Sequence, residues 1–327
     1  MLLTKKKDNN LHLQNKLNEL KTEIAKGVIG QEEMVNSILI GLLTSGHILL
    51  EGVPGLAKTT TVKAVSQALN LDFKRIQFTP DLLPSDIIGA QIFDMKTNEF
   101  KIKKGPIFTN LLLADEINRA PAKVQSALLE VMQERQVTIA ENTFKVDSPF
   151  LVLATQNPIE QEGAYTLPEA QLDRFMFKIV VSYNTKEQEY EIAKKVTMNS
   201  FETINKVLEK ETLEELKKAV KNIHIDKELE EYIIDIIDAS RNPKDYALDD
   251  LVDIIHFGAS PRATIDMFKA VKANAYLRGN DYVSPIDIAM VVKNVLRHRI
   301  ILTYEAMAKE INVDDVIQKI LEKIAIP

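Results

Sequence analysis

The amino-acid sequence predicts an α/β protein in which a parallel sheet flanked by helices is followed by a smaller, all-helical domain. Three observations support this prediction. Short β-rich runs alternate with helical segments through the first half of the chain, which is the pattern of a parallel sheet. The glycine-bearing run GVPGLAKT lies between one of these apolar runs and a helical segment. After Tyr183 the pattern changes to charged amphipathic helices.

The elements follow one another in a regular order. Leucine spacing predicts an amphipathic helix at 11–24, before a turn at 27–30 and a second helix at 31–43. Strands are predicted at 47–50, 73–78, 111–114, 150–154 and 177–181. Several of these strands are apolar throughout, as expected for strands covered on both faces.

Two segments interrupt the alternation, and each is predicted to project from the body as a β-hairpin. The first lies at 88–108 and the second at 136–146, where the letters ENT separate two alternating runs. Helices of the second domain are predicted at 186–196, 213–223, 226–240, 262–278 and 284–298. We therefore divide the chain into an N-terminal helix (1–26), an α/β domain (27–185) and a helical domain (186–327).

Composition excludes several classes of protein. The 327 residues suffice for about two domains, and the hydrophobic fraction of 45% is typical of soluble globular proteins. No apolar run is long enough to span a membrane and the start lacks the apolar core of a signal peptide, so we expect a cytoplasmic location. Without cysteine there is no disulfide, zinc–thiolate site or thiol nucleophile, and the five histidines show no ligand spacing. We therefore expect no metal site built from cysteine or histidine ligands.

The run GVPGLAKT matches the phosphate-loop pattern G-x-x-x-x-G-K-[ST] except at Ala57, which replaces the last glycine. Gly52 and Gly55 allow backbone N–H groups to surround a phosphate at the positive end of the next helix. Lys58 would reach the terminal phosphates, and the hydroxyl of Thr59 would ligate Mg²⁺. Alanine suits the first turn of a helix, so Ala57 should fit if this position has right-handed backbone angles. The alternative is an ordinary Gly/Pro turn before a helix.

A second apolar strand ends in two carboxylates, Asp115 and Glu116. Asp115 would support the metal, directly or through water, and Glu116 would orient or deprotonate the attacking water. An exposed acidic pair at the end of a strand is the alternative, and the position of this pair after the phosphate loop in an α/β region disfavours it. The pair indicates nucleotide hydrolysis and not binding alone.

Asn157 follows a third buried strand and precedes Pro158, which favours an extended or turn conformation. Its amide could orient the lytic water. A turn-forming asparagine is the alternative, and taken alone it is the commoner role.

Two arginines are candidates for contacts with phosphate. Arg174 lies too far along the chain to be assumed near its own phosphate loop, so it is a candidate to serve a neighbouring subunit. Its alternative role is a helix-end arginine paired with Asp173 or Glu169. Arg262 follows a predicted helix N-cap, where a cation is unfavourable against the helix dipole, and it could reach phosphate from the helical domain. The alternative is that Arg262 is only a surface charge at the start of a helix.

The first hairpin carries Lys101, Lys103 and Lys104, which could contact a nucleic-acid backbone. Asp94 and Glu99 interleave with them, and no cluster of stacking aromatic side chains accompanies them. The net charge of −6 also argues against nucleic-acid binding as the main role. We expect a solvated hairpin.

Seven runs taken together resemble the MoxR family of AAA+ ATPases. They are GVIGQ (27–31), GVPGLAKT (52–59), QFTPDLLPSDIIG (77–89), LLLADEINRAP (111–121), LATQNPIEQEG (153–163), LPEAQLDRF (167–175) and GASPRA (258–263). Their order and separations agree with the family from about residue 27 to 300, and Ala57 becomes a residue typical of the family.

The resemblance implies a role for each candidate residue. The run at 52–59 would be Walker A, Asp115 and Glu116 Walker B, Asn157 sensor 1, Arg174 the arginine finger and Arg262 sensor 2. ATP and Mg²⁺ are the implied ligands. The implied nucleotide contacts are Val28, Ile29, Gly52, Val53, Pro54, Gly55, Leu56, Ala57, Lys58, Thr59, Thr60 and Arg262, with Val28 and Ile29 flanking adenine. The implied catalytic residues are Lys58, Glu116, Asn157 and Arg174, and the metal ligands are Thr59 and Asp115.

The resemblance also implies the working assembly. Such proteins form rings, usually hexamers, with ATP between subunits, and remodel or activate client proteins in a chaperone-like role. They often act alongside proteins with a von Willebrand factor A (VWA) domain. Hydrolysis would swing the helical domain, Arg262 would sense the γ-phosphate, and Arg174 of the adjacent subunit would complete catalysis.

Two other functions remain open at this point. One is a DNA-dependent motor related to the helicases that share both hairpin insertions. The other is a nucleotide-gated scaffold without turnover, which the retention of Asp115 and Glu116 disfavours.

Overall fold

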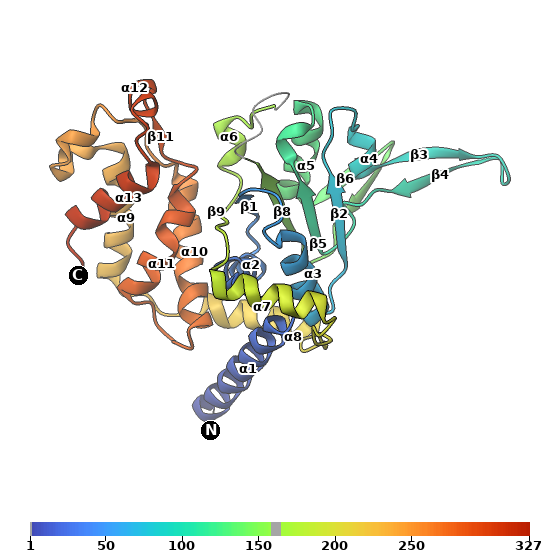
Figure 1. Cartoon of the computed structure of the whole chain (residues 1–327), viewed down its shortest axis with the longest axis horizontal. Coiled ribbons are helices and arrows are strands. Elements are labelled where there is room, and N and C mark those ends of the chain that lie inside the picture. The colour runs from blue at the N-terminus through green and yellow to red at the C-terminus, as the bar shows by residue number, and fades with distance from the viewer. Residues whose placement is uncertain (1, 158–164) are drawn as a thin grey trace.

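The computed structural model describes residues 2–157 and 165–327, with side chains from residue 10 onward (Figure 1). Residues 158–163 of the run LATQNPIEQEG, and Met1 of the predicted N-terminal helix, therefore lie outside the described residues. None of the helices in these described ranges is long and apolar enough to cross a membrane.

A five-stranded parallel sheet forms the centre of the first domain and confirms the predicted fold class. In spatial order its strands are β2 (Phe73–Gln77), β5 (Leu111–Asp115), β8 (Leu151–Gln156), β1 (Ile48–Glu51) and β9 (Phe177–Val180). All neighbouring strands run parallel. The carboxyl ends of β5, β8 and β1 therefore meet at one edge of the sheet, which is where ligands bind in sheets of this kind.

Helices cover both faces of this sheet. Leu111 and Leu113 pack in one hydrophobic cluster with α2 (Glu32–Thr44) and α3 (Lys58–Ala68). Their neighbours on the same strand, Leu112 and Ala114, belong to a second cluster that includes residues of α5 (Ala122–Glu134). Because successive side chains on a strand point to opposite faces, burial on both sides explains why β5 is apolar throughout.

Two hairpins project from the sheet domain, as predicted. The first consists of β3 (Gly89–Asp94) and β4 (Glu99–Lys104) after the short helix α4 (Pro84–Ile88), and it extends far from the body (Figure 1). The second pairs β6 (Gln136–Ile139) with β7 (Asn142–Lys145). Its turn is shorter than the predicted ENT turn, because Ala140 takes a left-handed conformation (φ 53°) that closes a two-residue turn.

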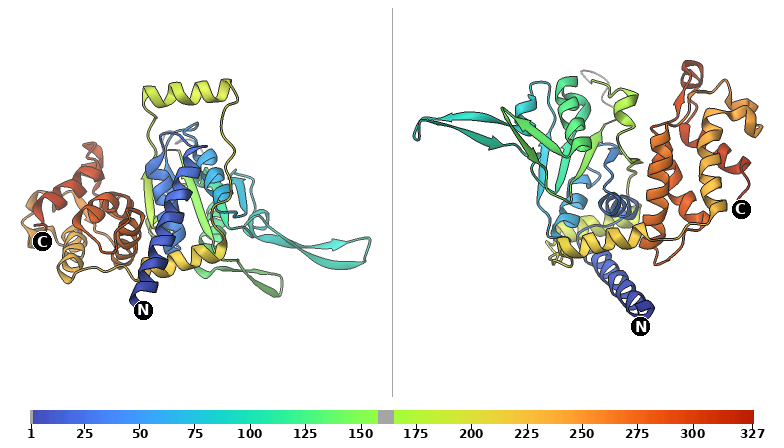
Figure 2. Two further views of the ribbon diagram at one scale, coloured as in Figure 1. Left: turned by 90° about the horizontal axis from the view of Figure 1, so that it is seen from below. Right: turned by 180° about the vertical axis from the view of Figure 1, so that it is seen from behind.

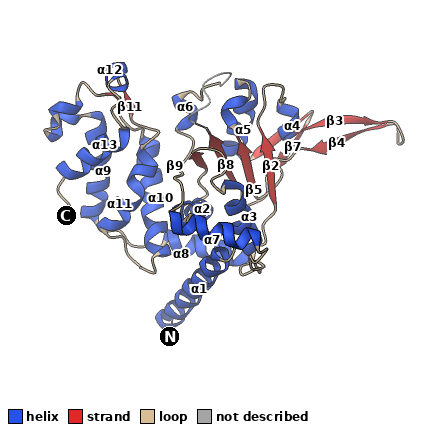
Figure 3. Ribbon diagram, viewed as in Figure 1, coloured by secondary structure: helices blue, strands red, loops and turns tan. Residues whose placement is uncertain are grey.

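The second half of the chain is mainly helical (Figure 3). Its helices are α7 (Lys186–Thr197), α8 (Lys210–Lys221), α9 (Lys227–Arg241), α10 (Pro261–Leu277), α11 (Pro285–Leu296), α12 (Tyr304–Ala308) and α13 (Val313–Lys323). Short 3₁₀ helices lie at Ile117–Arg119, Pro243–Tyr246 and Asp249–Leu251, and α6 spans Glu169–Leu172. The prediction of an all-helical domain needs one correction, since β10 (Ile255–Phe257) and β11 (Ile301–Leu302) form an antiparallel pair. That pairing joins segments distant in sequence, which local patterns do not reveal.

The N-terminal helix α1 (Leu2–Ala25) ties the two halves together. It packs against α3, α8 and α10, and Lys21 Nζ donates a hydrogen bond to the carbonyl oxygen of Leu277 at the end of α10 (2.8 Å). Figure 2 shows α8 running along the sheet domain while α9 to α13 form a separate body beside it. The predicted boundary at residue 186 stays a prediction.

Candidate nucleotide-binding site

The carboxyl ends of β1, β5 and β8 open into a cavity of about 360 Å³. It is lined by Gly52, Pro54, Gly55, Leu56, Ala57, Lys58, Thr59, Thr60, Arg75, Asp115, Glu116, Thr155, Gln156 and Asn157. The structure thus places the phosphate loop, both carboxylates and Asn157 in one site, although they are far apart in the sequence.

The phosphate loop turns sharply between β1 and α3. Gly52 has no room for a side chain, since a Cβ there would lie 2.8 Å from the carbonyl oxygen of Val181. Gly55 has a φ of 88°, which glycine adopts without strain.

Ala57 does not have the right-handed angles under which alanine would fit without strain. Its φ of 55° and ψ of 18° are left-handed, and it is the N-cap of α3. A change of handedness at this point turns successive N–H groups toward a common centre, as in other anion-binding turns. For alanine this conformation costs about 1 kcal/mol. The loop therefore carries backbone strain where phosphate is expected to bind.

The amine of Lys58 lies across the loop and donates a hydrogen bond to the carbonyl oxygen of Gly52 (2.5 Å). Burial lowers the pKa of Lys58, while the negative charges of Asp115, Glu116 and Glu51 oppose that shift. The lysine is thus held beside the carboxylates at the position where terminal phosphates are expected.

Thr155 on β8 organises the two acidic residues that follow β5. Its hydroxyl donates to Asp115 Oδ1 (2.6 Å), and its oxygen accepts from the backbone N–H of Glu116 (2.8 Å). Glu116 itself has left-handed angles, with a φ of 56° and a ψ of 51°. A non-glycine residue in this conformation is strained and is typical of functional sites.

The edge strand β2 adds polar partners to both carboxylates. Arg75 Nε donates to Asp115 Oδ2 (3.0 Å), and Gln77 Nε2 donates to Glu116 Oε2 (2.7 Å). Arg119 Nη1 also donates to Glu116 Oε2 (3.0 Å). These partners were not predicted as site residues, because only the pairing of β2 with β5 brings Arg75 and Gln77 beside the carboxylates.

The donor set around Asp115 suits a magnesium ion. Asp115 and Thr59 both line the cavity, and carboxylate and hydroxyl oxygens are the hard ligands that Mg²⁺ prefers. The described ranges contain no cluster of three or more histidine, aspartate or glutamate side chains that could hold a metal by themselves. A divalent cation would therefore need phosphate oxygens and water to complete its coordination.

The predicted adenine contacts lie outside this cavity. Gly27 and Thr60 line an adjoining cavity of about 320 Å³, and Thr60 is common to both cavities. Val28 instead borders a hollow between α1 and α2, and neither Ile29 nor Val53 lines any of the three spaces. The role of Val28 and Ile29 at adenine stays a prediction.

Arg174 and Arg262 line a different cavity, of about 340 Å³, together with Arg135 and Lys269. His47, which precedes β1, borders this cavity, whereas Gly52, which follows β1, borders the phosphate-loop cavity. The two cavities therefore lie at opposite ends of the same strand. The structure brings the two arginines together and keeps both away from their own phosphate loop.

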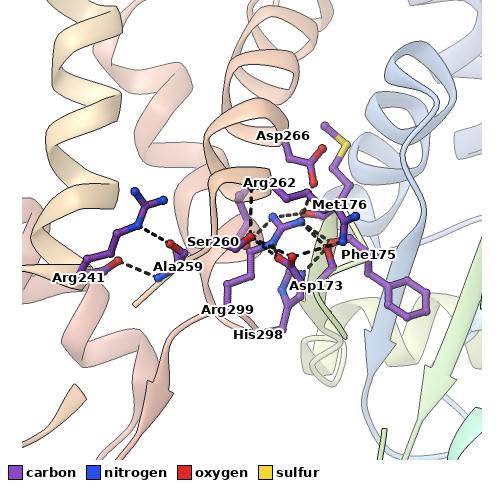
Figure 4. A network of polar contacts seen from close by, with 12 residues as sticks. Asp173, Phe175, Met176, Arg241, Ala259, Ser260, Arg262, Asp266, His298 and Arg299 are labelled. Atoms are coloured by element: carbon purple, nitrogen blue, oxygen red, sulfur yellow. Dashed lines mark hydrogen bonds and ion pairs between the residues drawn. The ribbon is translucent and has the colours of Figure 1, made fainter. Parts of the chain in front are cut away.

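The immediate partners of these arginines differ from those considered from the sequence. Arg174 Nη1 donates to the carbonyl oxygen of Leu129 (3.1 Å). Asp173 forms an ion pair with Arg262 (3.3 Å), which joins the sheet domain to α10 (Figure 4).

Two stretches of the chain match known protein families. Residues 47–177 match the ATPase family associated with various cellular activities (AAA), and residues 253–320 match the AAA lid domain. The first stretch includes the phosphate loop, the carboxylates and Arg174. The second includes Arg262.

The chain is also similar to individual proteins along nearly all its length. Chaperone MoxR1 of Mycobacterium tuberculosis is 48% identical over 305 residues, which cover 93% of this chain and 81% of that protein. Protein MoxR of Paracoccus denitrificans is 31% identical over 293 residues, covering 84% and 86% of the two chains. A crystal structure from Cytophaga hutchinsonii, provisionally described as an ATPase, is 49% identical, with a TM-score of 0.95 over 100% of this chain and 99% of that one.

Proposed function

The chain belongs to the MoxR family of AAA+ ATPases, and from that premise we propose that it hydrolyses ATP at a site shared between neighbouring subunits in order to remodel or activate partner proteins. In its own cavity the phosphate loop binds the phosphates through backbone N–H groups, and Lys58 neutralises their charge. Glu116 accepts a proton from the attacking water or orients it, and Asn157 helps to position that water. Mg²⁺, held by Thr59 and Asp115, would supply charge neutralisation at the phosphate oxygens when bound.

The location of Arg174 and Arg262 is the observation that carries this proposal. Both line a cavity at the amino end of β1, whereas the phosphate loop follows its carboxyl end. The intervening strand β1, of 4 residues, spans about 13 Å at a rise of about 3.3 Å per residue, so one subunit cannot bring both sites to one phosphate without large rearrangement. We therefore assign both arginines to the nucleotide of an adjacent subunit, which revises the expectation that Arg262 senses the γ-phosphate of its own site.

A head-to-tail interface between identical subunits meets this requirement. Such an interface joins two different surfaces of the same chain and closes into a ring when the rotation between subunits allows it. We propose a ring, with six subunits as the expected number. Each arginine pair would then complete the site of one neighbour and stabilise the charge that develops during phosphoryl transfer.

One relative of this chain, Chaperone MoxR1, is named as a chaperone, which supports an action on other proteins. We propose a chaperone-like action on a protein client in the cytoplasm, alongside a protein with a VWA domain. ATP-dependent capture by the Glu116→Gln variant would identify that client, with Lys58→Ala as the matched control that cannot hold nucleotide well.

The contacts of the first hairpin do not favour a DNA motor. Lys101 Nζ forms an ion pair with Asp94 (2.6 Å), and Lys104 lies over the rings of Phe108 and Phe144. Two of the three lysines that motivated this alternative are thus engaged with the protein itself.

A complementation experiment tests the shared site. Glu116→Gln and Arg174→Ala, with different affinity tags, are co-expressed and purified through both tags, so that only mixed oligomers remain. Each variant alone should be inactive, whereas the mixed oligomer should regain turnover where an intact phosphate site meets an intact arginine. Glu116→Gln mixed with Lys58→Ala is the control, because both changes lie in the same cavity. Full activity of Arg174→Ala alone, or no rescue in the mixture, would refute the shared site.

A further inference from the structure

The segment that carries Arg174 is tied to the helical domain by a buried arginine that the sequence did not single out. Arg299 follows α11, and its side chain is only 1% exposed. Its Nε donates to Asp173 Oδ1 (2.9 Å) and its Nη2 to Asp266 Oδ2 on α10 (2.6 Å). A guanidinium this deeply buried is stable only if its charge and its donors are matched by partners.

Arg299 also holds the backbone on both sides of Arg174. Its Nη2 donates to the carbonyl oxygens of Asp173 (3.1 Å) and Phe175 (2.8 Å), and its Nη1 donates to that of Met176 (3.3 Å). The neighbouring His298 donates from Nε2 to the same Phe175 oxygen (2.8 Å). Figure 4 shows these contacts converging on the short stretch between α6 and β9. The backbone at Arg174 therefore cannot shift without breaking several buried hydrogen bonds.

Asp173 in turn holds the start of α10, which carries Arg262. Its carboxylate accepts from the hydroxyl of Ser260, the N-cap of α10, at 3.0 and 2.9 Å. It also accepts from Arg262 Nη1 at 3.3 Å. One carboxylate thus faces Arg299, Ser260 and Arg262 at the same time, and it lies one residue before Arg174.

We propose that Asp173 and Arg299 are positioning residues that hold Arg174 and Arg262 as one unit for the neighbouring subunit's ATP. We call this pair the Asp173–Arg299 clasp. It makes the geometry of the arginine pair depend on the position of the helical domain, so a movement of that domain displaces both arginines together. The inference rests on the shared site of the proposed function.

Two substitutions separate positioning from simple folding. Asp173→Asn keeps the size of the side chain but removes the negative charge that faces Arg262 and Arg299. Arg299→Lys keeps a positive charge but loses the planar guanidinium that reaches several oxygens. We expect each to lower kcat about 10- to 100-fold, because small displacements of catalytic groups have effects of that size. Binding of ATP by the variant's own phosphate loop, followed with a fluorescent ATP analogue, should be unchanged.

Arg278→Lys is the matched control. Arg278 forms an ion pair with the fully buried Asp287 (3.0 Å) inside the helical domain and lines neither cavity. The same Arg-to-Lys change there should reduce thermal stability while leaving kcat unchanged. If Arg278→Lys lowered kcat as much as Arg299→Lys does, any loosening of the helical domain would be enough to impair turnover. That result would overturn the proposed role of the clasp.

Mixed oligomers provide the decisive measurement. Asp173→Asn co-purified with Glu116→Gln should regain turnover, because its own phosphate site is intact and its partner supplies a positioned arginine pair. Asp173→Asn mixed with Arg174→Ala should show no such rescue, because both substitutions impair the arginine side of the interface. Wild-type kcat in the two clasp variants, or no rescue by Glu116→Gln, would overturn the proposal.

The outcomes also separate this inference from the proposed function. If Arg174→Ala is not rescued by Glu116→Gln, the shared site itself fails. If that pair is rescued and Asp173→Asn is not, only the clasp fails. Circular dichroism and thermal unfolding show whether each variant is folded, and Ser260→Ala, which removes one hydroxyl from the cluster, carries the same test if the other two do not fold.

Discussion

The hydroxyl of Thr155 lies 2.6 Å from Asp115 Oδ1 and joins the end of β8 to the end of β5. The same oxygen accepts the backbone N–H of Glu116, so removing it leaves two polar groups without their partner. We expect Thr155→Val to destabilise the fold by about 1 to 3 kcal/mol, the cost of leaving such groups unpaired. We also expect kcat to fall at least about tenfold through misplacement of the carboxylates.

Steady-state phosphate release and thermal unfolding check this prediction. Thr197→Val is the control, because the Thr197 hydroxyl bonds only to carbonyls of its own exposed helix. Equal effects of the two substitutions would contradict the role assigned to Thr155.

Glu116→Gln should bind ATP but hardly turn it over. The amide keeps the shape of the side chain but cannot accept a proton, and loss of a general base lowers rates about 10²- to 10⁴-fold. Phosphate release at saturating ATP and binding of a fluorescent ATP analogue measure the two properties. Glu130→Gln on the exposed face of α5 should behave as the wild type, and wild-type turnover in Glu116→Gln would remove Glu116 from the mechanism.

Ala57→Gly should stabilise the protein although it removes a methyl group. Alanine at φ 55° is strained by about 1 kcal/mol, and relief of that strain outweighs the added freedom of the unfolded chain by up to about 0.5 kcal/mol. Urea denaturation measures the free energy of unfolding. Ala193 lies in the exposed helix α7 and therefore has right-handed angles. Ala193→Gly should lower the free energy of unfolding by about 1 kcal/mol. If both substitutions changed the free energy of unfolding in the same direction, the proposed strain at Ala57 would be contradicted.

Stability should fall in mild acid because of His47. Its Nδ1 accepts the N–H of Val152, and this hydrogen bond needs a neutral ring, while its Nε2 donates to the carbonyl oxygen of Met132. Burial, aided by the charge of Arg135, lowers the pKa of His47 to about 3. Its contribution is therefore complete above the unfolded pKa of about 6.5 and is lost as the pH falls toward 3, by up to about 1.4 kcal/mol per pH unit.

The variant His47→Gln should show a shallower dependence of the free energy of unfolding on pH below about 6.5. Some dependence should remain, because burial also lowers the pKa of His298. Urea denaturation across this range measures the slope, with His224→Gln at an exposed histidine as the control. An unchanged slope in His47→Gln would show that this ring does not govern the acid sensitivity.

Single-stranded DNA should leave ATP turnover unchanged. Lys101 and Lys104 are engaged within the chain, and the net charge is −6. Phosphate release is measured with and without an oligonucleotide at low and high salt. Stimulation that disappears as salt rises would instead support the DNA motor.

Local sequence patterns were sufficient for most elements. The five strands, both hairpins and the seven predicted helices appear where hydrophobic periodicity and turn residues placed them, with shifts at their ends. Two features could not be read from local patterns. The angles of Ala57 depend on how β1 and α3 are joined, and the pairing of β10 with β11 depends on contacts between distant segments.

The site was predictable only in part for the same reason. The phosphate loop and the two carboxylates have residue types and neighbours that indicate their chemistry directly. The strand pattern before Asn157 made that residue a candidate only. Arg75, Gln77 and Thr155 look like ordinary strand residues until the order β2, β5, β8 brings them beside Asp115 and Glu116.

The sequence by itself determined the fold class, the phosphate loop and the indication of hydrolysis, because each depends on residues that are close along the chain. Only the tertiary structure decided that Arg174 and Arg262 share a cavity at the other end of β1, and that Arg299 and Asp173 hold that region together. Such relationships arise from strand order and from the packing of α10 and α11 against the sheet domain. They join residues far apart in the sequence, and no local pattern encodes their distance.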